Sequence, residues 1–221
     1  MSPELCLRRE DDRDLAVLVW RFDAPVRVIS SAPLGGGIGL RSWVLNAQVP
    51  SNYPRTDPER HVGEIAAELA LEGDGVGMLT AADVRAVRHV TDGGVDAAVS
   101  VGLGQPTWAS APDAVSERAT CRSTSGEKPD VSRHVVGTIN VVAWIPACLC
   151  PAALVNATAT VAEAKAQALF EAGIAGTGTA TDAIVIACPD TGEVEAFGGP
   201  RSTWGARLAR ATHAAVLAGA R

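Results

Sequence analysis

The sequence predicts an α/β fold in the broad sense, a layered mixed sheet with helices rather than a purely parallel, doubly wound sheet. Two observations favour this class. Strand-like and helix-like segments alternate after Arg55, as they do in layered α/β proteins. Residues 84–90 and 94–103 flank the turn "TDGG" as an antiparallel hairpin would. A purely parallel sheet has no such pair. The 221 residues suit a single domain spanning 1–221.

The first half of the chain contains two strand signals and one helix signal. "LAVLVWRF" (15–22) and "VRVISS" (26–31) are apolar and rich in β-branched residues, so we expect two strands. Pro58 fits the first turn of a helix, and residues 59–73 follow a helical period. The apolar face of that helix consists of Val62, Ile65, Ala66 and Leu69.

The second half begins with a long aperiodic segment. Residues 105–133 are rich in Pro, Ser, Ala and charge, which predicts a long loop. Residues 135–162 carry no charge, but prolines and asparagines interrupt them. We therefore expect a buried strand, a proline-bounded turn and a helix over 152–172, rather than a membrane span. A last helix is predicted over 201–221.

Composition restricts the partners. The net charge is −6 and no block of Lys or Arg is present, so nucleic acid is an unsuitable partner and small molecules or proteins remain. Charges run through the first fourteen residues, and the apolar run after them is too short for a signal peptide. We expect a cytoplasmic protein without a membrane partner.

The five cysteines fit a reducing compartment. Cys148 and Cys150 form a C-x-C pair, but a tetrahedral metal site needs further ligands, and no second pair or H-x-x-x-H run supplies them. We expect no metal site.

The segment "AGTGTATDAIVIACP" (175–189) has the composition of a binding loop. Asp182 stands at the mouth of a predicted strand, and Gly176 and Gly178 allow the backbone to approach a bound group closely. An ordinary helix-to-strand turn explains the same residues, with Gly173 ending the helix and Asp182 bonding the loop amides. Both interpretations remain open at this point.

The predicted helix over 152–172 carries one narrow polar stripe. Asn156, Thr160, Glu163 and Gln167 fall within about 60° of one another at 100° per residue. An amphipathic helix turns such a stripe to solvent. However, short Asn and Thr side chains with one acid differ from the usual Lys and Glu mixture, and Lys165 points to the opposite side. A lined cavity is the competing interpretation.

Six segments carry a family resemblance. They are "SSAPLGGGIG", "WVLNAQVPSNYPRTDP", "GMLTAADV", "GTINVVAWIP", "ALVNATATVAEAKAQAL" and "GTGTATDAIVIAC". In order and approximate spacing, the sequence from Ser30 to Cys188 resembles the adenosylcobinamide amidohydrolase family. It departs from the family pattern after "SVGLGQPTWA", where the long polar segment begins.

The resemblance implies a hydrolase of corrinoid salvage. Such an enzyme cuts the amide that joins aminopropanol to the corrin ring of adenosylcobinamide and releases adenosylcobyric acid. It implies a small-molecule corrinoid as partner and no separate cofactor, since the cobalt arrives within the substrate. A protein that binds or carries adenosylated corrinoids without cutting them is the alternative.

The residues suggest how an amide could be cut. The motifs H-E-x-x-H and G-x-S-x-G do not occur. Among the acids within the family segments, we take Glu163 and Asp182 as the catalytic candidates. We expect Glu163 to be the base, because partial burial on the helix would raise the pKa of its carboxyl group toward neutrality. We expect Asp182 to orient water or the leaving amine. An alternative uses Thr80 as nucleophile with Asp83 or Glu163 nearby.

Substrate contacts are predicted from the same segments. Asn140 and Asn156 are expected to hold the amide, and the amides of residues 176–179 to stabilise the oxyanion. Glycine-rich loops would allow a flat ligand to come close. The predicted substrate-binding residues are Gly35, Gly36, Asn46, Asn140, Asn156, Thr160, Gln167, Gly176, Gly178 and Thr179.

Overall fold

A computed structural model describes residues 1–112 and 137–221. Within this part of the chain, one mixed sheet has the strand order β4-β3-β2-β9-β7-β6-β5, and β1 pairs with β2 beside this path. Its strands are β1 (Glu4–Glu10), β2 (Arg13–Ser30), β3 (Gly37–Gln48), β4 (Gly75–Thr80), β5 (Arg88–Asp92), β6 (Val95–Val101), β7 (Ile139–Trp144) and β9 (Ala183–Cys188). The helices are α1 (Pro58–Glu68), α2 (Pro151–Glu171) and α3 (Thr203–Gly219), and the short strands β8 (Cys148–Leu149) and β10 (Val194–Glu195) pair separately.

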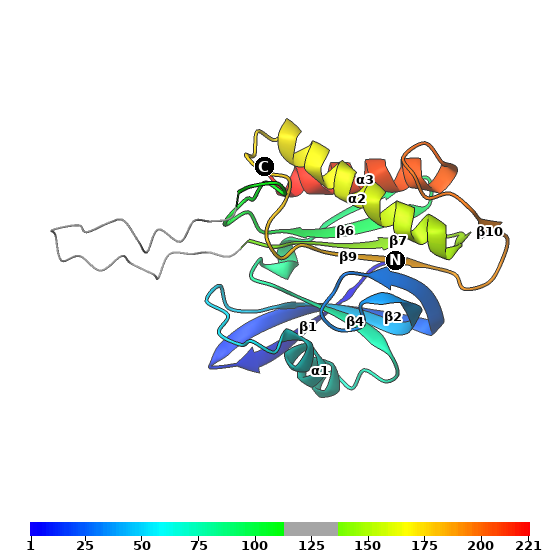
Figure 1. Cartoon of the computed structure of the whole chain (residues 1–221). Helices are drawn as coiled ribbons and strands as arrows, with labels where there is room; N and C mark the ends of the chain where they lie inside the picture. Colours follow the sequence, from blue (N-terminus) through cyan, green and yellow to red (C-terminus); the bar gives the residue numbers. More distant parts are fainter. Residues whose placement is uncertain (113–136) are drawn as a thin grey trace.

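The sheet doubles back on itself, so the molecule has four layers (Figure 1). Helices α2 and α3 cover the half that contains β6, β7 and β9, and α1 covers the half that contains β3 and β4. Three apolar cores separate these layers. The central core joins side chains of β2, β3 and β4 to side chains of β6, β7 and β9. Alternate residues of each strand therefore face either a helix or the opposite half of the sheet.

Strand β2 makes this arrangement possible. It is 18 residues long, and its pairing with β3 shifts register between Arg21 and Val26. Along its other edge, the first part pairs with β1 and residues 27–30 pair with β9. One irregular strand thus belongs to both halves, as is common where a bulge bends a sheet.

Local sequence explains where the two long helices begin. Pro151 occupies the first turn of α2, and the Cys150 sulfur accepts a hydrogen bond from the Ala153 amide at 3.4 Å. The Ser202 hydroxyl caps α3 by accepting from the Gly205 amide at 3.1 Å. Small residues on the facing sides allow α2 and α3 to pack closely together against the sheet.

The predicted fold class is confirmed. β3 with β4 and β7 with β9 are parallel, whereas the other pairs in the sheet are antiparallel. The predicted hairpin is β5 and β6, paired antiparallel from Asp92 and Val95. The three predicted helices are present, although α1 ends at Glu68. No helix in the described ranges is long and apolar enough to cross a bilayer.

Three expectations need correction or remain outside the described residues. Segments 15–22 and 26–31 are one strand, because β3 pairs along both. Residues 84–86 form a 3₁₀ turn that Asp83 caps, so the strand predicted over 84–90 begins at Arg88. Of the predicted loop 105–133, residues 105–112 contain no helix and only a bridge from Thr107 to Gly178; residues 113–133 lie outside the described part.

Candidate functional site

Buried polar side chains meet between the two halves of the sheet. Asn46 on β3 donates from Nδ2 to the Ser100 hydroxyl on β6 at 2.9 Å. Asn140 on β7 donates from Nδ2 to Asn46 Oδ1 at 2.9 Å and to the Leu79 carbonyl on β4 at 3.0 Å. All three side chains are 2% exposed or less. Four strands that are distant in sequence are therefore joined by one hydrogen-bonded group.

One atom of the Asn140 side-chain amide, Oδ1, lacks a hydrogen-bond partner among the described residues. Its two neighbours, Asn46 Oδ1 and the Leu79 carbonyl, are both acceptors, which fixes the NH₂ group toward them. Among the described residues, Asn140 Oδ1 has no hydrogen-bond partner although it is buried. A buried acceptor of this kind requires a donor. Next to the group, Thr80 is buried and its hydroxyl accepts from the Ala82 amide at 3.1 Å.

Asp182 lies at the start of β9, on the face of the sheet that α2 covers. Its Oδ1 accepts from the Ile139 amide at 2.8 Å and from the Thr179 hydroxyl at 2.5 Å. Its Oδ2 accepts from the Thr179 amide at 3.0 Å and from Lys165 Nζ. A carboxylate accepts about four hydrogen bonds. Partners within the protein therefore occupy all the hydrogen-bonding positions of the Asp182 carboxylate.

Lys165 projects from α2 to meet this carboxylate. Side-chain exposure is 11% for Lys165 and 9% for Asp182, so the ion pair is nearly buried. A Cβ atom at Gly178 would overlap both Lys165 Nζ and Asp182 Oδ2. Any residue with a Cβ at this position would have to displace the ion pair, so glycine fits where the loop crosses it.

The glycine loop uses most of its amides internally. Gly176 donates to the Ile174 carbonyl at 3.0 Å, Thr177 to the Thr107 carbonyl at 2.9 Å, and Thr179 to Asp182. Three of the four amides that were expected to stabilise an oxyanion therefore already have acceptors. The interpretation in which Asp182 bonds the loop amides describes this geometry.

These groups share one end of the strands, where β7 and β9 begin and β4 and β6 finish. We call it the strand-end site and define it by Asn46, Thr80, Ser100, Asn140, Lys165 and Asp182. Asn140 faces the opposite half of the sheet and Asp182 faces α2. The site therefore has an inner group and an outer group, on the left of Figure 1.

Each of the six segments that carry the family resemblance contributes to this end of the molecule. Five of them supply Asn46, Thr80, Asn140, Lys165 and Asp182. The sixth reaches it through Ser31, which exchanges two hydrogen bonds with Ile184, both at 3.0 Å. Gly35 and Gly36 of that segment lie further away, because a Cβ at Gly35 would overlap the Gly75 carbonyl at the start of β4. Their glycines are explained by close backbone packing.

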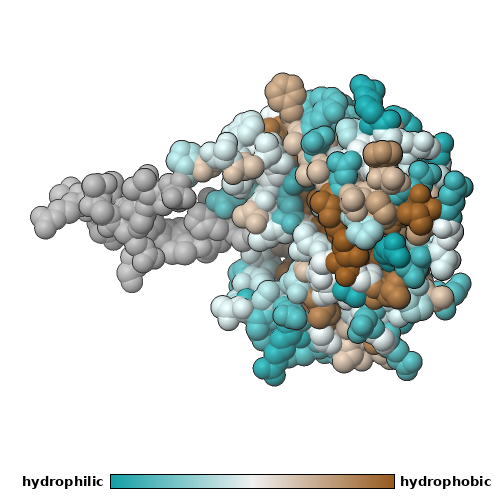
Figure 2. Space-filling view, turned by 45° about the vertical axis from the view of Figure 1, so that its right-hand side comes forward, coloured by the Kyte–Doolittle hydropathy of each residue, from teal (hydrophilic) through white to brown (hydrophobic). Residues whose placement is uncertain are grey.

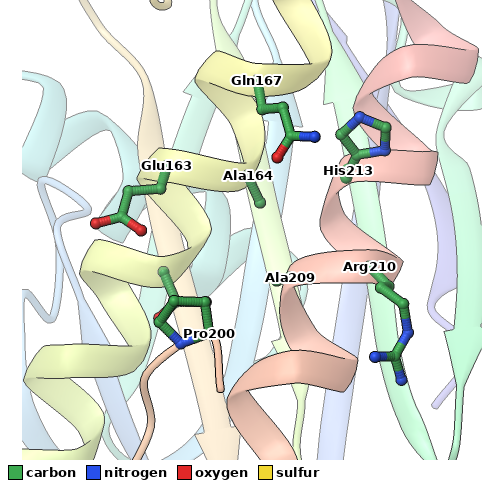
Figure 3. A pocket seen from close by; sticks show the side chains of 8 residues that line it. Glu163, Ala164, Gln167, Pro200, Ala209, Arg210 and His213 are labelled. Atoms are coloured by element: carbon green, nitrogen blue, oxygen red, sulfur yellow. The ribbon is translucent and has the colours of Figure 1, made fainter. Parts of the chain in front are cut away.

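The polar stripe of α2 faces a different place. Thr160, Glu163 and Gln167 line a groove of about 250 Å³ that Arg210 and His213 of α3 also line (Figure 3). In that view Gln167 and His213 point toward each other, whereas the Glu163 carboxylate points away from α3. The groove is an outer surface feature between two helices, which we call the α2–α3 groove.

Most polar residues of the α2–α3 groove already have partners. Gln167 and His213 both bond Glu171, at 2.8 and 2.9 Å. The hydrogen bond from Gln167, assisted by His213, lowers the pKa of Glu171. Arg210 forms two bonds of 2.7 Å with Asp92. Thr160 is buried and bonds the Gly198 carbonyl at 3.0 Å.

The structure does not bring the two predicted acids together. Glu163 is exposed, so the partial burial expected for it is wrong. Lys165, which binds Asp182, follows two residues later and projects about 200° around the helix from Glu163. Asn156 is also exposed and lies beside Gly199, away from Asn140. Asp182 and Asn140 therefore belong to the strand-end site, and Glu163, Thr160 and Gln167 to the α2–α3 groove.

Sequence reasoning missed Lys165 and Ser100. The sequence pattern predicts only that Lys165 lies opposite the polar stripe, yet it is one of two lysines, with Lys128, among 19 basic residues. Ser100 lies in an apolar strand with no distinguishing neighbour in sequence. A lone charge on the apolar side of an alanine-rich helix was the available signal for Lys165.

The end of the strands opposite the strand-end site has an apolar surface. Figure 2 turns that side forward and shows apolar side chains gathered on it. Val194 on β10 is 57% exposed and Phe197 is 73% exposed. Nowhere in residues 1–112 and 137–221 do three or more His, Cys, Asp or Glu side chains gather as metal ligands would. The strand-end site lies at the opposite end of the strands from this apolar surface.

Comparison with known proteins identifies the family of the chain. The profile of the family described as adenosylcobinamide amidohydrolase matches residues 3–221. The chain is similar to the adenosylcobinamide amidohydrolase of Methanosarcina mazei, with 29% identity over 165 residues, which cover 73% of this chain and 71% of the relative. It is also similar to that of Halobacterium salinarum, with 32% identity over 186 residues, covering 83% and 75%. The chain belongs to the adenosylcobinamide amidohydrolase family.

Proposed function

We propose that this protein hydrolyses the amide between aminopropanol and the corrin ring of adenosylcobinamide, and so returns adenosylcobyric acid to cobamide synthesis. The observation that supports this most strongly is the family match over residues 3–221. The reaction adds water across a C–N bond, giving a carboxylate and an ammonium. It requires the cobalt only as part of the substrate.

We place the reaction at the strand-end site. The six segments that resemble the family converge there, although the first and last are far apart in sequence, as Ser31 and Ile184 illustrate with a separation of 153 residues. A buried polar atom without a hydrogen-bond partner calls for an explanation, and a donor supplied by a bound ligand is one. Asn140 Oδ1 is such a group, and an amide N–H of the substrate is the donor that it lacks.

The α2–α3 groove suits the reaction less well. Pockets for drug-sized ligands have volumes of about 300–1,000 Å³, and a corrinoid is larger than such ligands. The groove holds about 250 Å³. Its polar side chains are also mainly paired with one another. We therefore propose that Glu163 lies outside the catalytic site, and that Asp182 supports it from within.

The test is incubation of the purified protein with adenosylcobinamide, with mass spectrometry to detect aminopropanol. Release of aminopropanol with multiple turnovers is the expected result. A protein that binds adenosylcobinamide tightly and releases no aminopropanol would instead be a corrinoid binder or carrier. Denatured protein is the matched control, since it contains the same side chains without the site.

A further inference from the structure

The chain uses arginine for nearly all its positive charges, and Lys165 is an exception. Of 19 basic residues, 17 are arginines. Arginine suits buried ion pairs because its planar fork binds a carboxylate with two hydrogen bonds. Lysine offers instead a compact charge with three donors. A buried pair that served only for stability would fit the arginine preference of this chain.

Asp182 holds Lys165 and has no capacity left for a second role. Its four hydrogen bonds come from Ile139, Thr179 and Lys165. A base must accept a proton from water, and a carboxylate with all its lone pairs occupied is poorly placed to do so. What Asp182 does provide is a fixed position for the Lys165 ammonium beside the loop 176–179.

The Lys165 ammonium donates only one hydrogen bond within the described residues. Within the described residues, Asp182 Oδ2 is the acceptor that Lys165 Nζ binds, which leaves two of its three N–H groups for other acceptors. Its side chain keeps 11% exposure, so the group is not sealed from a ligand. Gly178 lets the loop backbone run directly against the ion pair, since a Cβ there would overlap Nζ, and this places the ammonium beside the loop.

We propose that Lys165 is a catalytic residue that donates hydrogen bonds to the carbonyl oxygen of the scissile amide. This rests on the proposed function. As water adds to the carbonyl carbon, the C=O electron pair moves to the oxygen, and the ammonium stabilises that negative charge. The C=O bond then re-forms as the C–N bond breaks, and both protons of the water pass to the departing nitrogen, so that the products are the carboxylate and the ammonium. Lys165 keeps its own protons throughout.

This role replaces the one expected of the loop amides. Amide hydrolysis needs a donor for the developing oxyanion. Three of the four loop amides are bonded within the protein, which leaves the Gly178 amide and the adjacent ammonium, and of these two the ammonium carries the full positive charge. A fixed charge in a site of low polarity interacts more strongly with an oxyanion than the same charge in water.

The first experiment compares wild type with Lys165→Met. Removing one oxyanion donor typically lowers kcat by about 10²–10³-fold, and we expect a loss in that range with substrate affinity changed less than about threefold. Arg60→Met is the matched control, because it removes one positive charge from an exposed ion pair on α1 and should leave kcat unchanged. A folded Lys165→Met protein with kcat near wild type, or with only its affinity reduced, would overturn the proposal.

A second comparison stays decisive if Lys165→Met folds poorly. Asp182→Asn and the double variant Lys165→Met/Asp182→Asn both lack the carboxylate, and they differ only in the ammonium. The proposal predicts that the double variant is at least about tenfold less active than Asp182→Asn, although it contains no unpaired buried charge. A purely structural ion pair predicts the reverse order. An inactive wild type would refute the proposed function, whereas equal activity of these two variants would refute only the role of Lys165.

Discussion

Asn140 joins the two halves of the sheet by hydrogen bonds in the buried centre of the molecule. Its NH₂ group serves two acceptors, Asn46 Oδ1 and the Leu79 carbonyl, from β3 and β4. These bonds cross from one half of the sheet to the other. Because the group is buried, each acceptor that loses its donor carries the full cost of desolvation.

Replacing Asn140 by Asp changes one NH₂ group into an oxygen at almost constant shape. The new oxygen would face two acceptors, so we expect the free energy of unfolding to fall by about 2 kcal/mol or more. Asn156→Asp is the matched control, because Asn156 is exposed on α2 and should change stability by less than about 0.5 kcal/mol. Urea unfolding measures both. Equal stability of the two variants would contradict the proposed importance of the buried group.

We expect the buried side chain of His61 to make the stability of the protein depend on pH. The residue is 3% exposed, its ring stacks on Tyr53, and Nδ1 lies 2.9 Å from the Tyr53 hydroxyl. Burial lowers the pKa of His61 below its ordinary value of 6.5, against the opposing effect of Glu10. The folded state therefore keeps His61 neutral at pH values where the unfolded chain binds a proton there.

The expected result is a loss of stability on acidification. As the pH falls through 6.5, unfolding takes up a proton at His61, and the folded state becomes less favourable. We expect the wild-type Tm to fall between about pH 7.5 and about pH 5.5, and to fall less in His61→Gln, which cannot titrate there. Calorimetry at both pH values tests this. An equal decrease in the two proteins would assign the effect to other groups.

At the level of elements, α1 depends on a glycine of β4. A Cβ atom at Gly77 would overlap the Val62 side chain, which α1 buries against the sheet. Gly77→Ala should therefore displace α1 and lower the free energy of unfolding by about 1–3 kcal/mol. Gly63→Ala on α1 is the control, since a Cβ there meets no atom within 4 Å. It should stabilise the helix by up to about 1 kcal/mol, and chemical denaturation that ranks the two variants in the other order would refute this packing.

Elements with strong local signals were predictable from sequence. Helices α1, α2 and α3 have proline or serine at their starts and regular apolar faces, and the β5–β6 hairpin has glycines at its turn. Strand β1 was not predicted. Its residues are largely charged and exposed, and what orders it is pairing with β2 along seven residues, which is information that a local pattern does not contain.

At the scale of the whole molecule, the mixed sheet was predictable but its doubling back was not. Contact between Asn46, Ser100 and Asn140 depends on β3 facing β6 and β7 across the central core. The long irregular β2 creates that geometry. Asp182 was recognised from its loop, whereas its partner Lys165 was not, because the pair forms only once α2 lies over β9. The same packing turns Glu163, on the other side of α2, toward the α2–α3 groove.

Two carboxylate variants distinguish a reaction at the strand-end site from a reaction in the α2–α3 groove. Asp182→Asn, Glu163→Gln and wild type are incubated with adenosylcobinamide, and the rate of aminopropanol release is measured at equal concentrations of folded protein. Loss of the group that fixes Lys165 should lower the rate at least about tenfold in Asp182→Asn. Glu163 is exposed on the other side of α2, so Glu163→Gln should stay within about threefold of wild type. An inactive Glu163→Gln beside a fully active Asp182→Asn would contradict the account and place the reaction in the α2–α3 groove.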